Sequence, residues 1–412
     1  MVPFPHLPLS VDEIRTMLET LAAAPPDPIL GLTDAFVQDP RADKINLTIG
    51  VYRDEAGLTP ILDSVKQAEQ RLLGDEKTKG YLGIDGLPEF RRLASELTLG
   101  PWVAADRVAA CQTPGGTGAL RVAADFLAQQ VPQARVWCST PTWPNHISIF
   151  EAAGLTTAAY PYLAADRKSL DFAAMLDQLD REGRAGDVLL LHACCHNPTG
   201  IDPTAEQWSD IAELAAQRGM LPLIDFAYHG FGEGLDEDRI AVAEISKQHS
   251  EFLVCSSFSK NFGLYSERVG ALLAVTADAD TAARVASNIK VTVRSNYSNP
   301  PRHGGAIVAT ILGDAQLRQQ WLGELAQMRK RIHDMRSLFV EAMRKTGCDV
   351  DFSFLLNQRG MFSYSGLTPM QVDWLRSNRG IYMVGSGRIN IAGITPTNIG
   401  TLTAAIAEAL KA

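Results

Sequence analysis

A lysine flanked by small hydroxyl residues is the most informative feature of the sequence. The segment from Ser256 to Arg268 follows an apolar run and contains Lys260. A lysine just past the carboxyl end of a buried strand lies where α/β folds open their ligand crevice, and desolvation there lowers the amine pKa, as Schiff-base formation requires. Ser257, Ser259 and Arg268 supply two hydroxyls and a fixed cation, which suit a phosphate. A single lysine is more often a loop residue on the surface, but these neighbours favour a reactive amine beside a phosphate site.

A second candidate phosphate site is the glycine-rich turn at residues 112–118, between a predicted strand and a predicted helix. Gly116 permits close backbone approach, and the first turn of the helix, with Thr117, offers free N–H groups to an anion. The turn is not a Walker A loop, because no Lys-Ser/Thr pair follows. It is not a Gly-x-Gly-x-x-Gly motif, because Arg121 occupies the last position. Such turns are often only structural, so the signal is weak alone.

An acidic residue and a phenol come at the end of another apolar run, at Asp225 and Tyr228. A buried carboxylate can keep a cofactor ring nitrogen protonated, as pyridoxal 5′-phosphate (PLP) requires. A nearby phenol can hydrogen-bond the 3′ oxygen of that cofactor and tune its pKa. An Asp that caps a turn, next to a Tyr in the core, is the competing interpretation.

The segment from His192 to Gly200 combines two His, two Cys and an Asn-Pro-Thr-Gly turn. Zinc is the obvious hypothesis, but Cys194 and Cys195 would face opposite sides of a strand, and no second ligand cluster exists in the sequence. We therefore predict no metal. The turn instead favours delivery of the Asn197 amide to the crevice.

The elements that must position these residues alternate between short apolar runs and amphipathic stretches. This alternation predicts an α/β fold with a mostly parallel central sheet flanked by helices and right-handed crossovers. Because the carboxyl ends of parallel strands share one edge, the four clusters should converge there. Predicted strands are 107–113, 135–139, 188–195, 221–225, 252–256 and 269–275, and predicted helices are 119–130, 170–182, 205–218 and 280–290, with Asp202 as an N-cap.

The two ends of the chain have a different pattern from the middle. A long charged helix is predicted from Asp314 to about Thr346, followed by short strand-like pieces and a last helix. We predict a large α/β domain over residues 60–325 and a smaller α+β domain from residues 1–59 and 326–412. Residues 1–25 form an extension without an assigned role, and one helix is expected at 11–21.

Composition excludes several classes of protein. The 412 residues carry 38 Lys+Arg against 47 Asp+Glu, a net charge of −9, and no basic tract, which disfavours partners such as nucleic acid or anionic membranes. Apolar runs fall far short of the ~20 residues that a transmembrane helix needs. The prolines near the start disfavour a signal peptide, and the six cysteines, whose positions show no paired spacing, indicate reduced thiols, so we expect a cytoplasmic protein.

Taken together, the motifs resemble class I PLP-dependent aminotransferases of fold type I, in the aspartate/aromatic subgroup. The resemblance rests on Ser-x-Ser-Lys followed by Arg268, Asn-Pro-Thr-Gly, Asp-x-Ala-Tyr and the Gly-Gly-Thr-Gly turn. It covers nearly the whole chain, from Asp27-Pro28-Ile29-Leu30-Gly31-Leu32 to Ser386-Gly387-Arg388-Ile389-Asn390.

The resemblance implies a role for each matching residue around the cofactor. Lys260 would hold PLP as an internal aldimine and then move a proton between Cα and C4′. Asp225 would pair with the pyridine nitrogen, and Tyr228 and Asn197 would bond the 3′ oxygen. Trp143 would stack on the ring and contact the substrate, although a core Trp is the competing interpretation. The implied phosphate ligands are Arg268, Ser257, Ser259, Gly116, Thr117 and, from a neighbouring subunit, Tyr81.

Substrate recognition is implied in the same way. Arg388 would bind the α-carboxylate with a two-pronged guanidinium, helped by Asn197 and the Gly50 backbone. Arg294 would reach across a homodimer to the distal carboxylate of a dicarboxylic substrate, which makes the dimer necessary for activity.

The expected reaction is a ping-pong amino transfer from L-aspartate, aromatic L-amino acids or both to 2-oxoglutarate. The segment 355–364 is more similar to aromatic-type members, whereas Thr59, Thr117 and Asn299 are more similar to aspartate-type members. This mixture favours dual specificity. The alternatives are a strictly aromatic aminotransferase, a catalytically silent protein of the same fold, and a dinucleotide-dependent oxidoreductase.

Overall fold

A seven-stranded sheet forms the centre of the chain in a computed structural model that describes residues 18–19, 21–23 and 30–412. The helix expected at 11–21 and most of the 1–25 extension lie outside the described residues. Across the sheet the strands are β2 (Val108–Pro114), β8 (Val269–Val275), β7 (Phe252–Ser257), β6 (Leu221–Phe226), β5 (Val188–His192), β3 (Arg135–Thr140) and β4 (Thr156–Pro161).

Six strands run in one direction, and β8 is antiparallel to both of its neighbours, β2 and β7. The prediction of a mostly parallel sheet is therefore confirmed. The sequence pattern did not predict β4, because its residues Thr-Thr-Ala-Ala-Tyr-Pro form no apolar run.

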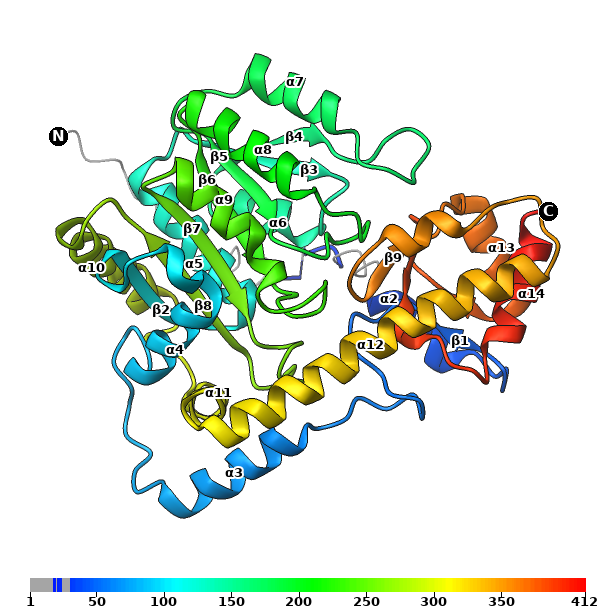
Figure 1. Ribbon diagram of the computed structural model, residues 1–412, viewed down its shortest axis with the longest axis horizontal. Helices are drawn as coiled ribbons and strands as arrows, with labels where there is room; N and C mark the ends of the chain where they lie inside the picture. Colours follow the sequence, from blue (N-terminus) through cyan, green and yellow to red (C-terminus); the bar gives the residue numbers. More distant parts are fainter. Residues whose placement is uncertain (1–17, 20, 24–29) are drawn as a thin grey trace.

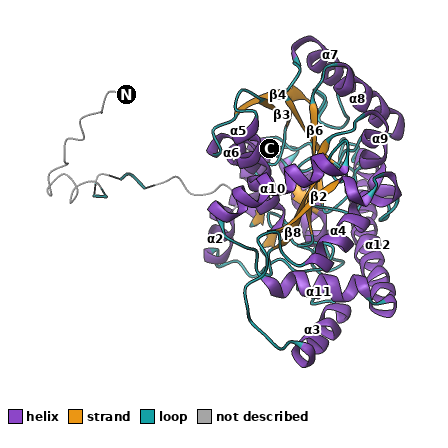
Figure 2. Cartoon of the chain, turned by 90° about the vertical axis from the view of Figure 1, so that its left-hand side faces the viewer, coloured by secondary structure: helices purple, strands orange, loops and turns teal. Residues whose placement is uncertain are grey.

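Helices cover both faces of this sheet (Figure 2). Successive residues of β5 alternate between two hydrophobic clusters: Leu189 and Leu191 belong to one, and Val188 and Leu190 to the other. A strand buried on both faces is an apolar run, as the sequence of β5 indicates. On one face lie α5 (Gly115–Gln130), α6 (Asn145–Ala152) and α10 (Ala279–Asn296), and on the other lie α4 (Pro88–Leu99), α8 (Ala205–Gln217), α9 (Ile240–Gln248) and α11 (Arg302–Gly313), with α7 (Phe172–Glu182) near β4.

One helix start differs from the prediction. Helix α8 begins at Ala205 with Thr204 as N-cap, in a capping box with Gln207, so Asp202 as N-cap is wrong. The Asp202 carboxylate instead accepts hydrogen bonds from the backbone N–H groups of Cys195 and His196.

The N-terminal and C-terminal parts of the chain pair with each other. Strand β1 (Ile45–Asn46) pairs with β10 (Ile381–Tyr382), and β9 (Phe362–Tyr364) pairs with β11 (Arg388–Asn390). The 31-residue helix α12 (Ala315–Lys345) runs from α11 and α3 (Asp63–Asp75) to α14 (Ile399–Ala409), as Figure 1 shows. Helices α2 (Leu30–Gln38) and α13 (Pro369–Arg379) lie beside these short strands (Figure 1).

None of the described helices is long and apolar enough to cross a membrane. The six cysteines are free thiols, and five of them are buried.

Candidate functional site

A cavity of about 250 Å³ opens where strands β2, β6 and β7 end. The Gly-rich turn follows β2, Asp225 is the penultimate residue of β6, and Lys260 lies three residues beyond β7, so the shared carboxyl edge brings them together. Twelve of the fourteen predicted site residues line the cavity: Gly50, Gly116, Thr117, Trp143, Asn197, Asp225, Tyr228, Ser257, Ser259, Lys260, Arg268 and Arg388.

The Lys260 amine lies inside this cavity, 4.4 Å from the ring centre of Tyr228. Burial is the main cause that lowers its pKa to about 8; the Asp225 carboxylate opposes this shift, and the Arg268 guanidinium adds a smaller lowering effect. An amine with this pKa is neutral in an appreciable fraction near neutral pH, and only the neutral form attacks a carbonyl carbon.

The Asp225 carboxylate is buried and holds a hydrogen bond of 2.9 Å to Nε2 of His146. Burial alone would raise the pKa of Asp225. The hydrogen bond from His146 and the electrostatic effects of His146 and Lys260 outweigh burial, and the pKa is lowered. Nδ1 of His146 in turn lies 2.9 Å from Oγ1 of Thr142. An ionised carboxylate fixed in this way suits a cationic ring nitrogen.

The phenol of Tyr228 is buried beside Asp225, and burial raises its pKa. It therefore stays protonated and can donate to an oxygen on a bound ring. Asn197 also lines the cavity, and its side-chain Oδ1 is buried without a hydrogen-bond partner, so this oxygen is free to accept a hydrogen bond.

An anion cradle lies at the start of α5. Nη1 of Arg268 is 3.3 Å from Oγ of Ser259 and 3.1 Å from the carbonyl oxygen of Tyr265. A Cβ on Gly115 would lie 2.5 Å from Nη2 of Arg268, and one on Gly116 would lie 2.9 Å from Cβ of Ser257, so only glycines allow the helix start to approach these groups. The first turn of α5 adds backbone N–H donors and the positive end of the helix dipole.

Arg388 lies on the opposite side of the cavity, in β11. Its guanidinium packs 4.1 Å from the ring centre of Phe362, and its Nη2 donates to the Thr48 carbonyl at 2.7 Å. Burial lowers its pKa, and its Nε is buried without a partner. Because an unpaired buried cation is costly, this site favours an anionic ligand such as a carboxylate.

These features test whether PLP fits the cavity. The phosphate would meet the Arg268 cradle, the ring nitrogen would meet Asp225, the 3′ oxygen would meet Tyr228 and Asn197, and the aldehyde would meet Lys260. Each polar group of the cofactor has a matching partner, and the donor set therefore fits.

Two of the predicted residues lie elsewhere in this single chain. Tyr81 is 97 % exposed, and Arg294, in the last turn of α10, is exposed and donates to the Ser298 hydroxyl. Neither lines the cavity.

The structure adds residues for which the sequence predicted no role. Tyr265 and Phe362 line the cavity, and His146 supports Asp225. Tyr265 and Phe362 belong to segments that the sequence had already singled out, and His146 follows Trp143 by three residues, but only the fold shows which side chains turn inward.

Potential metal ligands do not gather at the two cysteines. Within the described residues, ligand atoms close enough to share an ion occur at His146, His192 and Asp225. Burial lowers the pKa of His192 to about 3, so this ring is neutral beneath Asp225.

Comparison with known proteins identifies relatives that match nearly the whole chain. The family model "Aminotransferase class I and II" matches residues 42–406. The chain is 56 % identical over 397 residues to an aspartate aminotransferase of Salmonella typhi, which covers 96 % of this chain and 100 % of that protein. It is 49 % identical over 391 residues to an aromatic-amino-acid aminotransferase of Pseudomonas aeruginosa, with 94 % and 98 % covered.

Solved structures agree with these sequence matches. The crystal structure of an aromatic-amino-acid aminotransferase from Burkholderia pseudomallei, covalently bound to pyridoxal phosphate, is 46 % identical and superposes with a TM-score of 0.93. The match covers 96 % of this chain and 99 % of that one.

Proposed function

The chain belongs to the class I and II aminotransferase family, and we propose that it transfers the amino group of L-aspartate and of aromatic L-amino acids to 2-oxoglutarate, with PLP as its cofactor. One observation carries the proposal: the Lys260 amine, the Asp225 carboxylate and the Arg268 guanidinium meet around one cavity. When bound, PLP supplies an aldehyde carbon that accepts an amine and a cationic ring that accepts electrons from the substrate Cα.

Lys260 is the group that moves the proton. Its amine would hold the cofactor, and once the substrate has displaced it, the free amine would accept the proton from the substrate Cα and return it to the bound group. A pKa near 8 suits this exchange, because a catalytic base works best when its pKa lies close to the operating pH.

The other cavity residues hold the reacting groups in place. Asp225 would keep the ring nitrogen of the cofactor protonated, and the Tyr228 phenol and Asn197 amide would donate to its 3′ oxygen. Trp143 would cover the ring. The phosphate would be held by Arg268, Ser257, Ser259 and the N–H groups at Gly116 and Thr117.

Arg388 binds the α-carboxylate that every substrate shares, at the wall formed by Gly50. Arg294 provides the distal charge that aspartate and 2-oxoglutarate require. Aromatic substrates need Arg294 to turn towards solvent, because burying it unpaired is costly. Relatives with aspartate and with aromatic names match this chain over nearly the same length, which supports dual specificity over a strictly aromatic activity.

We propose a homodimer whose subunits complete each other's sites with Tyr81 and Arg294. The exposure of both side chains, and of the apolar Ile61, Leu73 and Val291, supports this arrangement. Subunit mixing tests it. Arg294→Gln and Lys260→Ala subunits are each defective with aspartate, but a mixed dimer contains one site with an intact Lys260 and an intact Arg294. Mixing should restore aspartate turnover, whereas no restoration would contradict a shared site.

The proposal also includes a division of the chain into two domains and a cellular location. The domain division at 60–325, against 1–59 with 326–412, is supported by the confinement of the large sheet to residues 108–275 and by the pairing of residues 45–46 with 381–382. A cytoplasmic location is supported by the six free cysteines, because reducing compartments keep thiols unpaired.

A spectroscopic experiment tests the function. Purified protein with PLP should show a visible absorption band that changes when aspartate or phenylalanine is added, and borohydride should fix the cofactor on Lys260. Steady-state turnover with 2-oxoglutarate then compares the two donors, with Lys260→Arg as the matched control that keeps the charge but loses turnover. A protein without a visible band would refute PLP chemistry, and turnover of only phenylalanine would support the strictly aromatic alternative.

A further inference from the structure

The wall of the cavity that Gly50 forms belongs to an irregular segment, Leu47–Tyr52. A segment outside helices and sheets must satisfy its backbone groups through other parts of the fold. The Leu47 N–H donates to the Tyr382 carbonyl at 2.8 Å, and the Leu47 carbonyl accepts from the Asn390 N–H at 2.9 Å. At the far end of the segment, the Tyr52 N–H donates to the Tyr265 hydroxyl at 2.9 Å.

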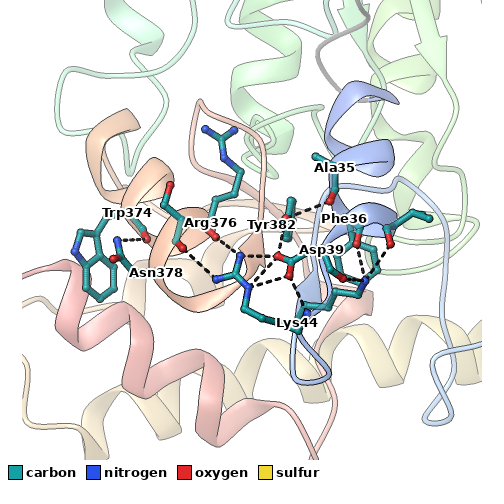
Figure 3. Close-up of polar contacts among 11 residues, drawn as sticks. Ala35, Phe36, Asp39, Lys44, Trp374, Arg376, Asn378 and Tyr382 are labelled. Carbon is teal, nitrogen blue, oxygen red and sulfur yellow. Dashed lines mark hydrogen bonds and ion pairs between the residues drawn. The ribbon is translucent and has the colours of Figure 1, made fainter.

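The chain that enters this segment is itself anchored. Figure 3 shows the Tyr382 hydroxyl, which donates to the Asp39 carboxylate at 2.8 Å, and Lys44, which donates to the Asp39 carbonyl at 2.6 Å. The Arg41 guanidinium binds both Asp39 oxygens and the Arg376 carbonyl at the end of α13. The start of the segment is therefore fixed on the C-terminal part of the chain.

The Asn390 side chain donates hydrogen bonds to the Leu47–Tyr52 segment on both sides of Gly50. Its Nδ2 donates to the Ile49 carbonyl at 2.5 Å and to the Val51 carbonyl at 2.9 Å. Its Oδ1 accepts from the Ala392 N–H at 3.0 Å. Asn390 is buried but does not line the cavity, so it can act on a ligand only through the groups that it holds.

The same segment is tied to the Arg388 site. Arg388 and Asn390 are alternate residues of β11 and so project to the same side of that strand. The Arg388 Nη2 holds the Thr48 carbonyl, and its guanidinium packs on Phe362. A Cβ on Gly50 would lie 2.9 Å from Cζ of Phe362. A displacement of the segment would therefore disturb both the Gly50 wall and the free side of the Arg388 guanidinium.

We propose that Asn390 is a positioning residue for the carboxylate end of the substrate site: by holding the carbonyls on both sides of Gly50, it keeps this wall and the Arg388 guanidinium in the geometry that accepts an α-carboxylate. The proposal rests on the proposed function, in which Arg388 binds that carboxylate. It assigns Asn390 no contact with substrate or cofactor.

Asn390→Ser separates positioning from a merely structural role. A serine hydroxyl can still accept from the Ala392 N–H, but it is too short to bridge the Ile49 and Val51 carbonyls. Asn398→Ser is the control, because the Asn398 side chain likewise donates to a backbone carbonyl (Gly393, 3.0 Å) and accepts from a backbone N–H (Thr395, 2.9 Å), but it holds one carbonyl where Asn390 holds two. The measurements are kcat and KM for aspartate, phenylalanine and 2-oxoglutarate, the dissociation constant of 3-phenylpropionate, which lacks an amino group and cannot react, and the cofactor absorption band.

We expect Asn390→Ser to raise KM for all three substrates by about tenfold, because the loss of two hydrogen bonds is worth at least that factor. The dissociation constant of 3-phenylpropionate should rise by a similar factor. Changes in kcat should stay below about threefold, since the α-carboxylate is bound in ground state and transition state alike. The absorption band should be unchanged, and Asn398→Ser should match the unsubstituted protein in every kinetic constant.

Unchanged KM values in a folded Asn390→Ser protein, or equal effects in the Asn398→Ser control, would overturn the proposal. Asn390→Asp provides a second test with the same side-chain shape. It keeps the acceptor for the Ala392 N–H but removes both donors, and it should raise KM at least as much. Normal KM values for this variant would also overturn the proposal. Failure of the proposed function is recognised separately, because the unsubstituted protein would then lack turnover.

Discussion

The reactivity of Lys260 can be predicted from its surroundings. In the protein freed of cofactor, its amine should titrate near pH 8, because burial disfavours the charged form and Arg268 adds repulsion. At pH 7, a pKa of about 8 leaves roughly one tenth of the amine neutral, against about 0.04 % for an ordinary lysine with a pKa of about 10.4. The neutral form is thus enriched by about two hundredfold.

Competitive labelling measures this pKa. Trace formaldehyde with a mild reductant methylates neutral amines, and mass spectrometry of the peptide that contains Lys260 gives its labelling rate between pH 6 and 11. N-acetyl-lysine in the same mixture serves as the reference amine. The labelling rate of Lys260 should level off above pH 8 to 9, while that of the reference should still rise.

The sign of the Asp225 effect provides a second check. The Asp225 carboxylate raises the pKa of Lys260, since it stabilises the ammonium form, so Asp225→Asn should move the labelling midpoint to a lower pH. Because the labelling is done on protein freed of cofactor, the effect of Asp225→Asn on the pKa of Lys260 is measured separately from any effect on cofactor binding. A midpoint near pH 10 in the unsubstituted protein, or an upward shift in Asp225→Asn, would refute the reasoning.

Three further substitutions test other parts of the site. Arg294→Gln should lower kcat/KM for aspartate by about a hundredfold and for phenylalanine by less than about fivefold, because only aspartate carries a distal carboxylate; equal losses in steady-state assays would contradict this role. Gly50→Ala should raise KM for both donors, since the new methyl would lie 2.9 Å from Cζ of Phe362. Unchanged KM values would contradict this and show that the Phe362 ring can move to make room for the methyl group. Gly270→Ala places a Cβ 2.4 Å from a backbone carbonyl carbon at the start of α5 and should reduce the free energy of unfolding by about 2–3 kcal/mol, measured by denaturant titration. Its control is Gly323→Ala, where an added methyl meets no atom within 4 Å and unfolding should be unaffected or slightly stabilised.

Elements with a strong sequence pattern could be predicted closely. Strand β8 was predicted with its observed bounds, and Asp314 caps the long helix α12 where the charged stretch was expected to begin. Elements with weak patterns were missed, such as β4, or misplaced, such as the start of α8. The local pattern reports burial, and it is uninformative where a strand is only partly buried, as β4 is, or where two capping residues compete.

Most of the candidate site could also be predicted, because strand ends of a parallel sheet meet at one edge. That rule places Lys260, Asp225 and the Gly-rich turn together without further knowledge of the fold. The rule does not predict that Tyr265 and Phe362 line the cavity, because their inward orientation depends on packing between segments far apart in the sequence.

Residue type and periodicity are local properties, and they suffice to identify the amine, the carboxylate and the phosphate-binding cation of the site and to predict that they lie at one edge of the sheet. How these groups act on one another depends on the folded chain. The pKa of Lys260 depends on the burial that surrounding segments impose, and the hold of Asn390 on the carbonyls beside Gly50 joins residues about 340 positions apart. Such contacts are set by the packing of distant segments, which no local pattern encodes.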